Sequence, residues 1–353
     1  MRSQSTKKSK VPLVTTSAPC RVDLGGTLDI KTFYYPLRHL APCTFNIALS
    51  LRTRVSLYAN DNPKIKVTSK GFEAAEFALK DAPFAHPLGL MFAVAAYFGA
   101  RGIHIDIDSS SPPKSALGGS SAAAVALIAA FDGLQRGQRE IGNFHRRRKI
   151  ARLAQEIEES IAGVPCGLQD QLAAVYGGVN NWHWLCGDTG AAFKRAPVFR
   201  PSLVKKIERR LLLAYCGVTH ESRDINRKWV RQFLEGKDRN QWKKIISSTK
   251  NFAAALTRSD FANAARELNR ETHIRRKMTP EVLDEMGEEL AAVALANNCG
   301  ARFTGAGGGG CMWALGEVEH IDRLRNKWES VLAGRPQAAL LDVKVDKQGV
   351  RFV

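Results

Sequence analysis

The sequence of 353 residues contains no apolar run long enough to cross a membrane. Its longest apolar runs, 88–100 and 122–131, are shorter than the roughly 20 residues that a spanning helix needs. The first ten residues, MRSQSTKKSK, are polar and basic, and no apolar segment follows them, which is unlike a secretory signal. We therefore predict a cytoplasmic protein with a disordered basic tail over residues 1–10 and no membrane partner.

Paired cysteines are absent as well. The seven cysteines are widely scattered, and no two of them form a C-x-x-C pair. This pattern argues against a disulfide framework and a structural zinc site, and it indicates a reducing compartment. The composition, with 44% hydrophobic and 24% charged residues, is typical of a folded globular protein, and the length is sufficient for two domains.

Acidic residues are few compared with basic ones, 34 against 52, which gives a net charge of +18. Nucleic-acid binding is one interpretation, and solvated helix faces are another. The basic clusters are dispersed, without interleaved aromatic residues or a helix-turn-helix pattern, so we do not expect a nucleic-acid partner. A third interpretation is a positive field that attracts small anionic substrates.

Strand and helix patterns alternate along the chain. Period-two alternation or a short buried run predicts strands at 21–24, 45–58, 101–108, 211–217 and 311–315. Helical periodicity predicts helices at 87–98, 120–132, 139–160, 222–234, 241–248 and 280–297. This succession favours an α+β protein with a domain boundary near residues 197–205.

The stretch PPKSALGGSSAAA at 112–124 connects a predicted strand to a predicted helix. A helix start carries unpaired N–H groups and a partial positive charge, and glycines allow an anion to approach the backbone closely. The stretch is therefore a candidate phosphate site. The alternative is that Ser120 or Ser121 only caps the helix, a role in which serine is favoured.

A second glycine-rich stretch, GAGGGG at 305–310, precedes a strand instead of opening a helix. It therefore differs from a dinucleotide-binding fingerprint, and the Walker pattern is also absent. Four successive glycines at 307–310 indicate a backbone that packs closely against either a ligand or another segment of the chain.

Two carboxylates flank a turn that contains Gly163, Pro165 and Gly167. We expect this turn to bring Glu159 and Asp170 together, one as a magnesium ligand and the other as a base or orienting group. Glu156 and Glu158 are instead expected on a solvated helix face. The alternative role for Asp170 is to cap the segment that follows it.

Three motifs occur in order: SAPCRVDLGGTLD at 17–29, PPKSALGGSSAA at 112–123 and RFTGAGGGGCMWAL at 302–315. Together they resemble the GHMP kinase superfamily, and GVPCGLQDQLAAVYGGVNNW at 163–182 is most similar to bacterial heptose kinases. The resemblance implies a two-domain α+β fold. Residues 11–200 would form an N-terminal ATP-binding domain with a left-handed β-α-β unit, and residues 201–353 a ferredoxin-like C-terminal domain.

The resemblance also implies an activity. It indicates an ATP- and Mg²⁺-dependent kinase that phosphorylates a sugar or sugar phosphate at the anomeric C1 hydroxyl, as D-glycero-D-manno-heptose 7-phosphate kinases do. The alternatives are a galactokinase- or fucokinase-like kinase of a neutral sugar, or a non-catalytic sugar or nucleotide sensor on the same fold. A homodimer remains an open alternative for its assembly.

Residue roles follow from motif positions. The resemblance implies that Asp170 is catalytic together with Arg21, and that Ser121 and Glu159 bind magnesium. It places Asp29, Asp170 and Gly308 at the substrate. The residues implied at ATP are Pro113, Lys114, Leu117, Gly118, Gly119, Ser120, Ser121, Gly307 and Gly308.

The sequence departs from the superfamily pattern in two motifs. Asp29 lies eight positions after Arg21, where sugar kinases of the superfamily generally have one more, so Asp29 could be displaced. Gly26-Thr27-Leu28 replaces the Glu-His pair of galactokinases, which argues against galactose as the substrate. Lys114 and Ala116 replace usual glycines, which predicts a stiffer loop, with Lys114 either contacting phosphate or pointing to solvent.

Overall fold

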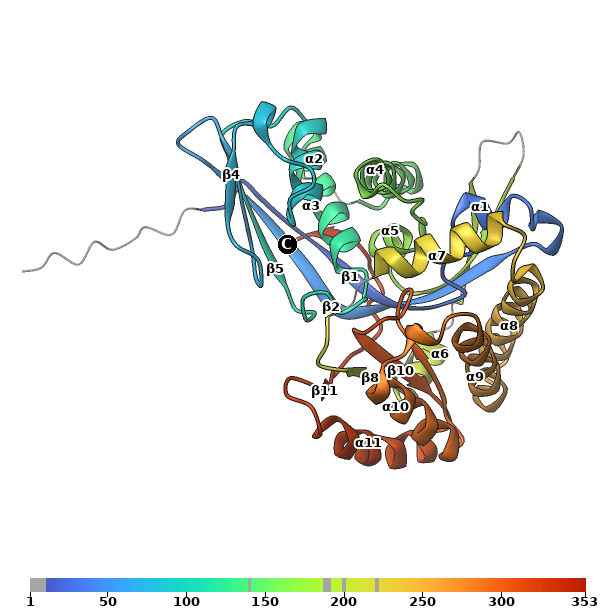
Figure 1. The fold of residues 1–353 in the computed structure, drawn as a ribbon. Helices are drawn as coiled ribbons and strands as arrows, with labels where there is room; N and C mark the ends of the chain where they lie inside the picture. The colour runs from blue at the N-terminus through green and yellow to red at the C-terminus, as the bar shows by residue number, and fades with distance from the viewer. Residues whose placement is uncertain (1–10, 139–140, 187–191, 199–200, 220–221) are drawn as a thin grey trace, which may run out of the picture.

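The computed structural model describes residues 11–138, 141–186, 192–198, 201–219 and 222–353 (Figure 1). The predicted basic tail at 1–10 lies outside these residues. The described chain forms a large sheet covered by helices and a smaller sheet with its own helices, which confirms the α+β prediction. No helix within the described ranges is long and apolar enough to cross a membrane.

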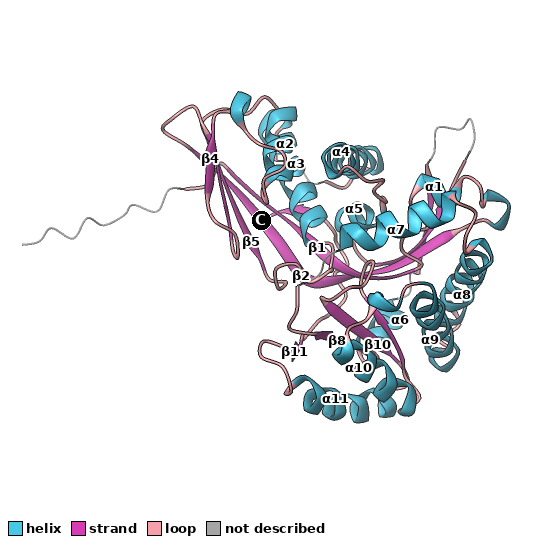
Figure 2. Cartoon of the chain, in the orientation of Figure 1, coloured by secondary structure: helices cyan, strands magenta, loops and turns pink. Residues whose placement is uncertain are grey.

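The large sheet is organised around one long strand, β2 (Cys43–Ala59), which Figure 2 shows running across it. β2 pairs along most of its length with β1 (Val14–Leu24), with β5 (Ile103–Ser109) at one end and with β6 (Val179–Trp184) at the other. β5 continues to the parallel strand β3 (Ile65–Ser69) and then to β4 (Ala75–Phe77), and β6 pairs with β7 (Phe193–Pro197).

Helices cover one face of this sheet, as Figure 1 shows: α2 (Gly89–Tyr97), α3 (Gly119–Arg136), α4 (Phe144–Ala162) and α5 (Gln169–Tyr176). Every residue of α3 from Ala122 to Phe131 is buried. Its many alanines allow close packing against both the sheet and the neighbouring helices. The start of α3 is thereby fixed at the end of β1.

The second sheet is antiparallel, in the order β11 (Ala339–Leu340), β8 (Leu211–Tyr215), β10 (Cys311–Leu315) and β9 (Gly300–Phe303). The described α-helices of this part of the chain are α6 (Pro201–Glu208), α7 (Ser222–Leu234), α8 (Arg239–Thr257), α9 (Phe261–Met278), α10 (Glu285–Ala296) and α11 (Val318–Leu332). α7 lies beside the short α1 (Lys31–Tyr34).

The two parts of the chain are interlocked at two places. The segment after β1 inserts Leu28, Ile30 and Phe33 into the core of the C-terminal part, where Phe33 lies 4.3 Å from the ring of Trp242. The last strand, β12 (Arg351–Phe352), returns to the large sheet and pairs with β1. Each part therefore contributes residues to the core or sheet of the other.

The glycine-rich loop between β9 and β10 is closely packed. Gly307, Gly308, Gly309 and Gly310 all have positive φ. A Cβ on Gly307 would lie 2.5 Å from the carbonyl oxygen of Val282, and one on Gly310 would lie 2.6 Å from that of Ser115. Gly307 and Gly310 are thus required by packing between segments of this chain, one of the two alternatives that the sequence left open.

This packing predicts different costs for two alanine substitutions at positive φ. Gly163→Ala introduces only backbone strain, because nothing lies within 4 Å of the new Cβ, and should lower the free energy of unfolding by about 1 kcal/mol. Gly307→Ala adds a backbone overlap and should lower it by about 2–4 kcal/mol. Urea unfolding of both variants measures the difference, and equal losses would contradict it.

Candidate functional site

A cavity of about 690 Å³ lies where the three motifs meet. Its wall includes Arg21 from β1, the 112–116 loop with the start of α3, the 164–171 turn, and Gly305 with Ala306. The cavity is also lined by Phe72, Phe84 and His86, which lie between β3 and α2, and by Met91 of α2. The motifs, which are distant in sequence, therefore surround a single site.

Arg21 and Asp170 form a two-point ion pair in this cavity. Arg21 Nε donates to Asp170 Oδ1 at 2.8 Å, and Arg21 Nη2 donates to Asp170 Oδ2 at 2.9 Å. Arg21 Nη1 donates to the Ala116 carbonyl, and the backbone N–H of Arg21 donates to the Leu117 carbonyl. Burial acts to lower the pKa of Arg21, but the Asp170 and Asp23 carboxylates raise it above its ordinary value.

Asp170 is in the first turn of α5, whose N-cap is Leu168. The alternative that Asp170 caps this helix is therefore wrong, because its carboxylate is held by Arg21 instead. A quarter of the Asp170 side chain, 24%, remains exposed toward the cavity it lines. The carboxylate is oriented and accessible at the same time.

Helix α3 begins beside this pair without a side-chain cap. Its N-cap is Gly118, with φ of +73°, and no side chain accepts from its first N–H groups. The Ser120 and Ser121 hydroxyls instead donate to Glu158, at 3.3 and 2.8 Å. The capping alternative for these serines is therefore wrong. The helix start presents free donors of the kind that bind phosphate.

The carboxylate beside Ser121 belongs to Glu158, and this corrects the prediction that Glu159 lies there. Gln171 Nε2 also donates to Glu158 Oε2, at 2.7 Å. Glu159 instead accepts from Gln155 and from the backbone N–H of Cys166, and it does not line the cavity. The expectation that Glu158 is solvated is wrong for the same reason. It lies four residues after Ala154, on the buried face of α4.

The Glu158 and Ser121 pair has the chemistry of a magnesium site. Burial and the nearby Asp170 charge raise the pKa of Glu158, against the lowering effect of its hydrogen bonds from Ser121, Gln171 and Ser120. The buried Oε1 of Gln171 has no hydrogen-bond partner. Magnesium binds through one or two carboxylates, phosphate oxygens and waters, so these oxygen groups fit it. Among the described residues, no three acidic, histidine or cysteine side chains are grouped so that they could hold a metal ion by themselves.

Asp29 lies in the same cavity, so the shortened first motif does not remove it from the site. Its Oδ2 accepts from the backbone N–H of Gln169 at 3.0 Å. Gly167 packs against it so closely that a Cβ there would lie 1.7 Å from Asp29 Oδ2. Burial raises the pKa of Asp29 to about 6, and the charges of Asp170 and Asp23 add to this.

The remaining predicted ATP residues have different surroundings. Pro113, Lys114, Gly118 and Gly119 line the cavity, and their contacts with ATP stay predictions. Lys114 is exposed and, like Ala116, has a positive φ, so the loop keeps its glycine-like turn without glycine. Leu117 is buried and does not line the cavity. Gly307 and Gly308 do not line it either, and in their motif Gly305 and Ala306 face the cavity. Contacts of Gly307 and Gly308 with nucleotide or substrate remain predictions.

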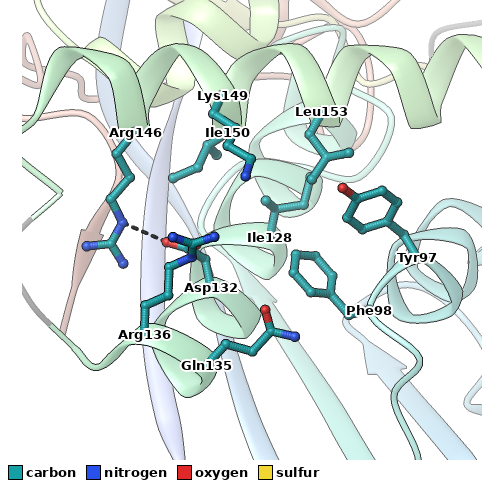
Figure 3. Close-up of a pocket in the computed structure, with 10 residues that line it drawn as sticks. All are labelled: Tyr97, Phe98, Ile128, Asp132, Gln135, Arg136, Arg146, Lys149, Ile150 and Leu153. Carbon is teal, nitrogen blue, oxygen red and sulfur yellow. Dashed lines mark hydrogen bonds and ion pairs between the residues drawn. The ribbon is translucent and has the colours of Figure 1, made fainter.

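A second, smaller hollow of about 270 Å³ lies between α2, α3 and α4 (Figure 3). It contains none of the motif residues. The Asp132 carboxylate there accepts from Arg146 at 2.6 Å and pairs with Arg136 at 3.1 Å. The motif-lined cavity is therefore the candidate active site.

Comparison with known families agrees with this arrangement. The family models for the GHMP kinases N terminal domain and the GHMP kinases C terminal domain match residues 86–178 and 252–334. The chain belongs to the GHMP kinases, and it is a phosphotransferase.

Individual relatives are more distant. A D-glycero-alpha-D-manno-heptose 7-phosphate kinase of Campylobacter jejuni is 26% identical over 96% of this chain and 98% of its own length. A mevalonate kinase of Pyrococcus horikoshii is 26% identical over 86% of this chain and 89% of its own. The solved structure of a putative sugar kinase from Campylobacter jejuni superposes with a TM-score of 0.71 at 22% identity, covering 96% of this chain and 98% of that one.

Adjacent glutamates provide a matched test of the metal site. Glu158→Gln should raise the magnesium concentration needed for half-maximal activity by about tenfold or more, because an oxygen ligand loses its charge. Glu159→Gln should change it by less than about twofold, because Glu159 is outside the cavity. Magnesium titration of turnover at saturating ATP measures both. A larger rise in the magnesium requirement for Glu159→Gln than for Glu158→Gln would instead support Glu159 as the magnesium ligand.

The raised pKa of Asp29 predicts a pH-dependent gain in stability for Asp29→Asn. The folded pKa of about 6 exceeds the ordinary 3.8, so stability falls as pH rises through this window. Above pH 6 the folded protein contains a costly buried charge, and asparagine removes at most about 3 kcal/mol of that cost.

Thermal unfolding between pH 4 and 8 measures this effect. Asp29→Asn should melt higher than the parent at pH 8, and the difference should vanish toward pH 4. Asp108→Asn, at an exposed position on β5, serves as the control. A lower melting temperature for Asp29→Asn at pH 8 would show that the Asp29 carboxylate is stabilising.

Proposed function

We propose that the protein is a sugar kinase that transfers the γ-phosphoryl group of Mg·ATP to the anomeric C1 hydroxyl of a sugar phosphate, with a heptose 7-phosphate as its acceptor. The observation that carries this proposal is the carboxylate of Asp170, which Arg21 holds by two hydrogen bonds beside the uncapped start of α3. A nucleophile-orienting carboxylate and a phosphate-binding helix start are the two parts that phosphoryl transfer to a hydroxyl needs.

The donor side of the site is built from the helix start and its serines. The N–H groups of Gly119, Ser120 and Ser121 would hold the ATP phosphates. Ser121 and Glu158 would hold Mg²⁺, which neutralises phosphate charge when bound. Arg21 lies within reach of the same region and adds a fixed positive charge.

The acceptor side is built from Asp170, Asp29 and the turn at Gly26 and Thr27, all of which line the cavity. Asp170 would accept the proton of the attacking hydroxyl or hold that hydroxyl in line with the phosphoryl group. Asp29 would accept a hydrogen bond from a second hydroxyl. Because the pKa of Asp29 is raised to about 6, this acceptor is fully ionised only above that pH.

The choice of acceptor is supported by the chain-wide likeness to the heptose 7-phosphate kinase, together with the Q-D-Q sequence at 169–171. Gln169 donates its backbone N–H to Asp29, Asp170 pairs with Arg21, and Gln171 donates to Glu158. Three successive residues thus connect the acceptor, the catalytic carboxylate and the metal ligand. We infer that this segment coordinates all three parts of the reaction.

An ADP-release screen tests the acceptor. We expect D-glycero-D-manno-heptose 7-phosphate to give a higher kcat/KM than free heptose, galactose, fucose, mannose or mevalonate. Efficient turnover of a neutral sugar without phosphosugar activity would overturn the heptose phosphate assignment. Turnover of mevalonate alone would overturn the sugar kinase proposal.

The role of Asp170 predicts a large effect of removing its charge. Asp170→Asn retains the shape of the side chain, so folding and ATP affinity should persist while kcat falls about 10²–10⁴-fold. ADP-release assays measure kcat, nucleotide titration measures the ATP affinity, and the melting temperature reports on folding. Turnover within a few-fold of the parent would show that the carboxylate is structural.

A further inference from the structure

Six charged side chains form a continuous buried chain behind the cavity, which we call the ion chain: Asp170, Arg21, Asp23, Arg302, Glu271 and Arg275. Its first three members come from α5 and β1, and its last three from β9 and α9. Successive nitrogen and oxygen atoms lie 2.8–3.6 Å apart along the whole chain. It joins the catalytic pair to the C-terminal part of the molecule.

The last four members of the ion chain are completely withdrawn from water. The side chains of Asp23, Arg302, Glu271 and Arg275 are all 0% exposed. Burial raises the pKa of Glu271, but Arg302 and Arg275 outweigh it, and the net shift is downward. Burial likewise raises the pKa of Asp23, but the charges of Arg302 and Arg21 outweigh it, and the net shift is again downward. Both carboxylates are therefore ionised at neutral pH.

The far end of the ion chain returns to the acceptor side of the cavity. Arg275 Nη2 donates to the Gly26 carbonyl at 2.6 Å, and its Nη1 lies 3.5 Å from Thr27 Oγ1. Gly26 and Thr27 both line the cavity, three and two residues before Asp29. One end of the ion chain thus holds Asp170, and the other holds the turn that leads to Asp29.

This turn has a conformation that needs external support. Thr27 has φ of +75°, which is a strained value for a β-branched residue. Thr27 Oγ1 is also 3.4 Å from Asn226 Oδ1 on α7. Such strain persists only where neighbouring groups determine the backbone, and Arg275 supplies the shortest of these bonds.

Arg275 is itself held firmly. Its Nε donates to Glu271 Oε1 at 2.9 Å, and its guanidinium lies 4.6 and 4.7 Å from the rings of Trp229 and Trp242. Glu271 is shared with Arg302, whose Nε donates to Oε2 at 2.8 Å. A buried ion pair is poor evidence of stabilisation, because desolvation offsets the attraction. The directional bonds to the turn indicate a positioning role instead.

We propose that Arg275, oriented by Glu271, is a positioning residue for the acceptor: it fixes the Gly26–Thr27 turn and so places Asp29 relative to Asp170. This inference rests on the proposed sugar kinase function, since it assigns the turn to acceptor binding. It predicts that damage to this end of the ion chain weakens acceptor binding and spares ATP binding, because the phosphate-binding helix start lies on other elements.

Two variants test the proposal against one control. Arg275→Lys keeps the charge but loses the planar fork that contacts Glu271 and Gly26 together. Glu271→Gln removes the charge that orients Arg275. Arg276→Lys is the matched control, because Arg276 is the next residue on α9 and pairs with Glu288 away from the ion chain. If Glu271→Gln does not fold, Arg275→Lys decides the outcome.

The first readout is steady-state kinetics with the acceptor that the wild-type screen identifies. In Arg275→Lys the acceptor KM should rise about tenfold or more while the ATP KM stays within about twofold, and Arg276→Lys should change neither. An unchanged acceptor KM, or an equal rise in both KM values, would overturn the positioning role.

The second readout is amide hydrogen exchange of the peptide containing residues 24–30 in the protein without ligands. Exchange there should accelerate in Arg275→Lys and not in Arg276→Lys. If the wild type phosphorylates no sugar, the proposed function fails, and exchange still decides whether Arg275 holds the turn. Unchanged exchange in Arg275→Lys would overturn the inference independently.

Discussion

The guanidinium of Arg21 is the point on which the site depends. It binds Asp170 on α5 through two nitrogens, the Ala116 carbonyl through the third, and lies 3.6 Å from Asp23. A lysine at this position could not form all of these contacts at once, because its ammonium group lacks the planar fork of donors. Through these bonds one side chain fixes the glycine-rich loop before α3, the Asp170 carboxylate and the first motif relative to one another.

The fold allows a buried cation at this place because charge of opposite sign surrounds it. The ion chain alternates in sign from Asp170 to Arg275, with three carboxylates and three guanidiniums. It crosses between the two sheets where Leu28, Ile30 and Phe33 insert into the C-terminal core. Apolar anchoring and ionic pairing therefore act on the same short segment, and both orient it toward the cavity.

The sequence was sufficient to predict the α+β class, the long central strands and helices around the motifs, and the meeting of the three motifs, because each motif combines glycines with chemistry-bearing residues at fixed spacing. It was insufficient for Glu158. Adjacent glutamates on a helix differ by a rotation of about 100°. The one signal in the sequence was that Glu158 continues the helical spacing of Ala151 and Ala154, which are buried. Helices α9 and α11 were not predicted, since their charged faces obscure the apolar ones. The ion chain could not be predicted from the sequence, because its ion pairs join residues that only the tertiary structure brings together.

The central claim is that Asp170 and Arg21 direct phosphate to the anomeric hydroxyl of a sugar phosphate. The most direct measurement is a phosphorus–proton correlation NMR spectrum of the product made by the wild-type protein from Mg·ATP and D-glycero-D-manno-heptose 7-phosphate. The account predicts a new sugar phosphorus signal that correlates with the anomeric proton. A new phosphorus signal that correlates with any other sugar proton, or no new sugar phosphorus signal, would contradict it.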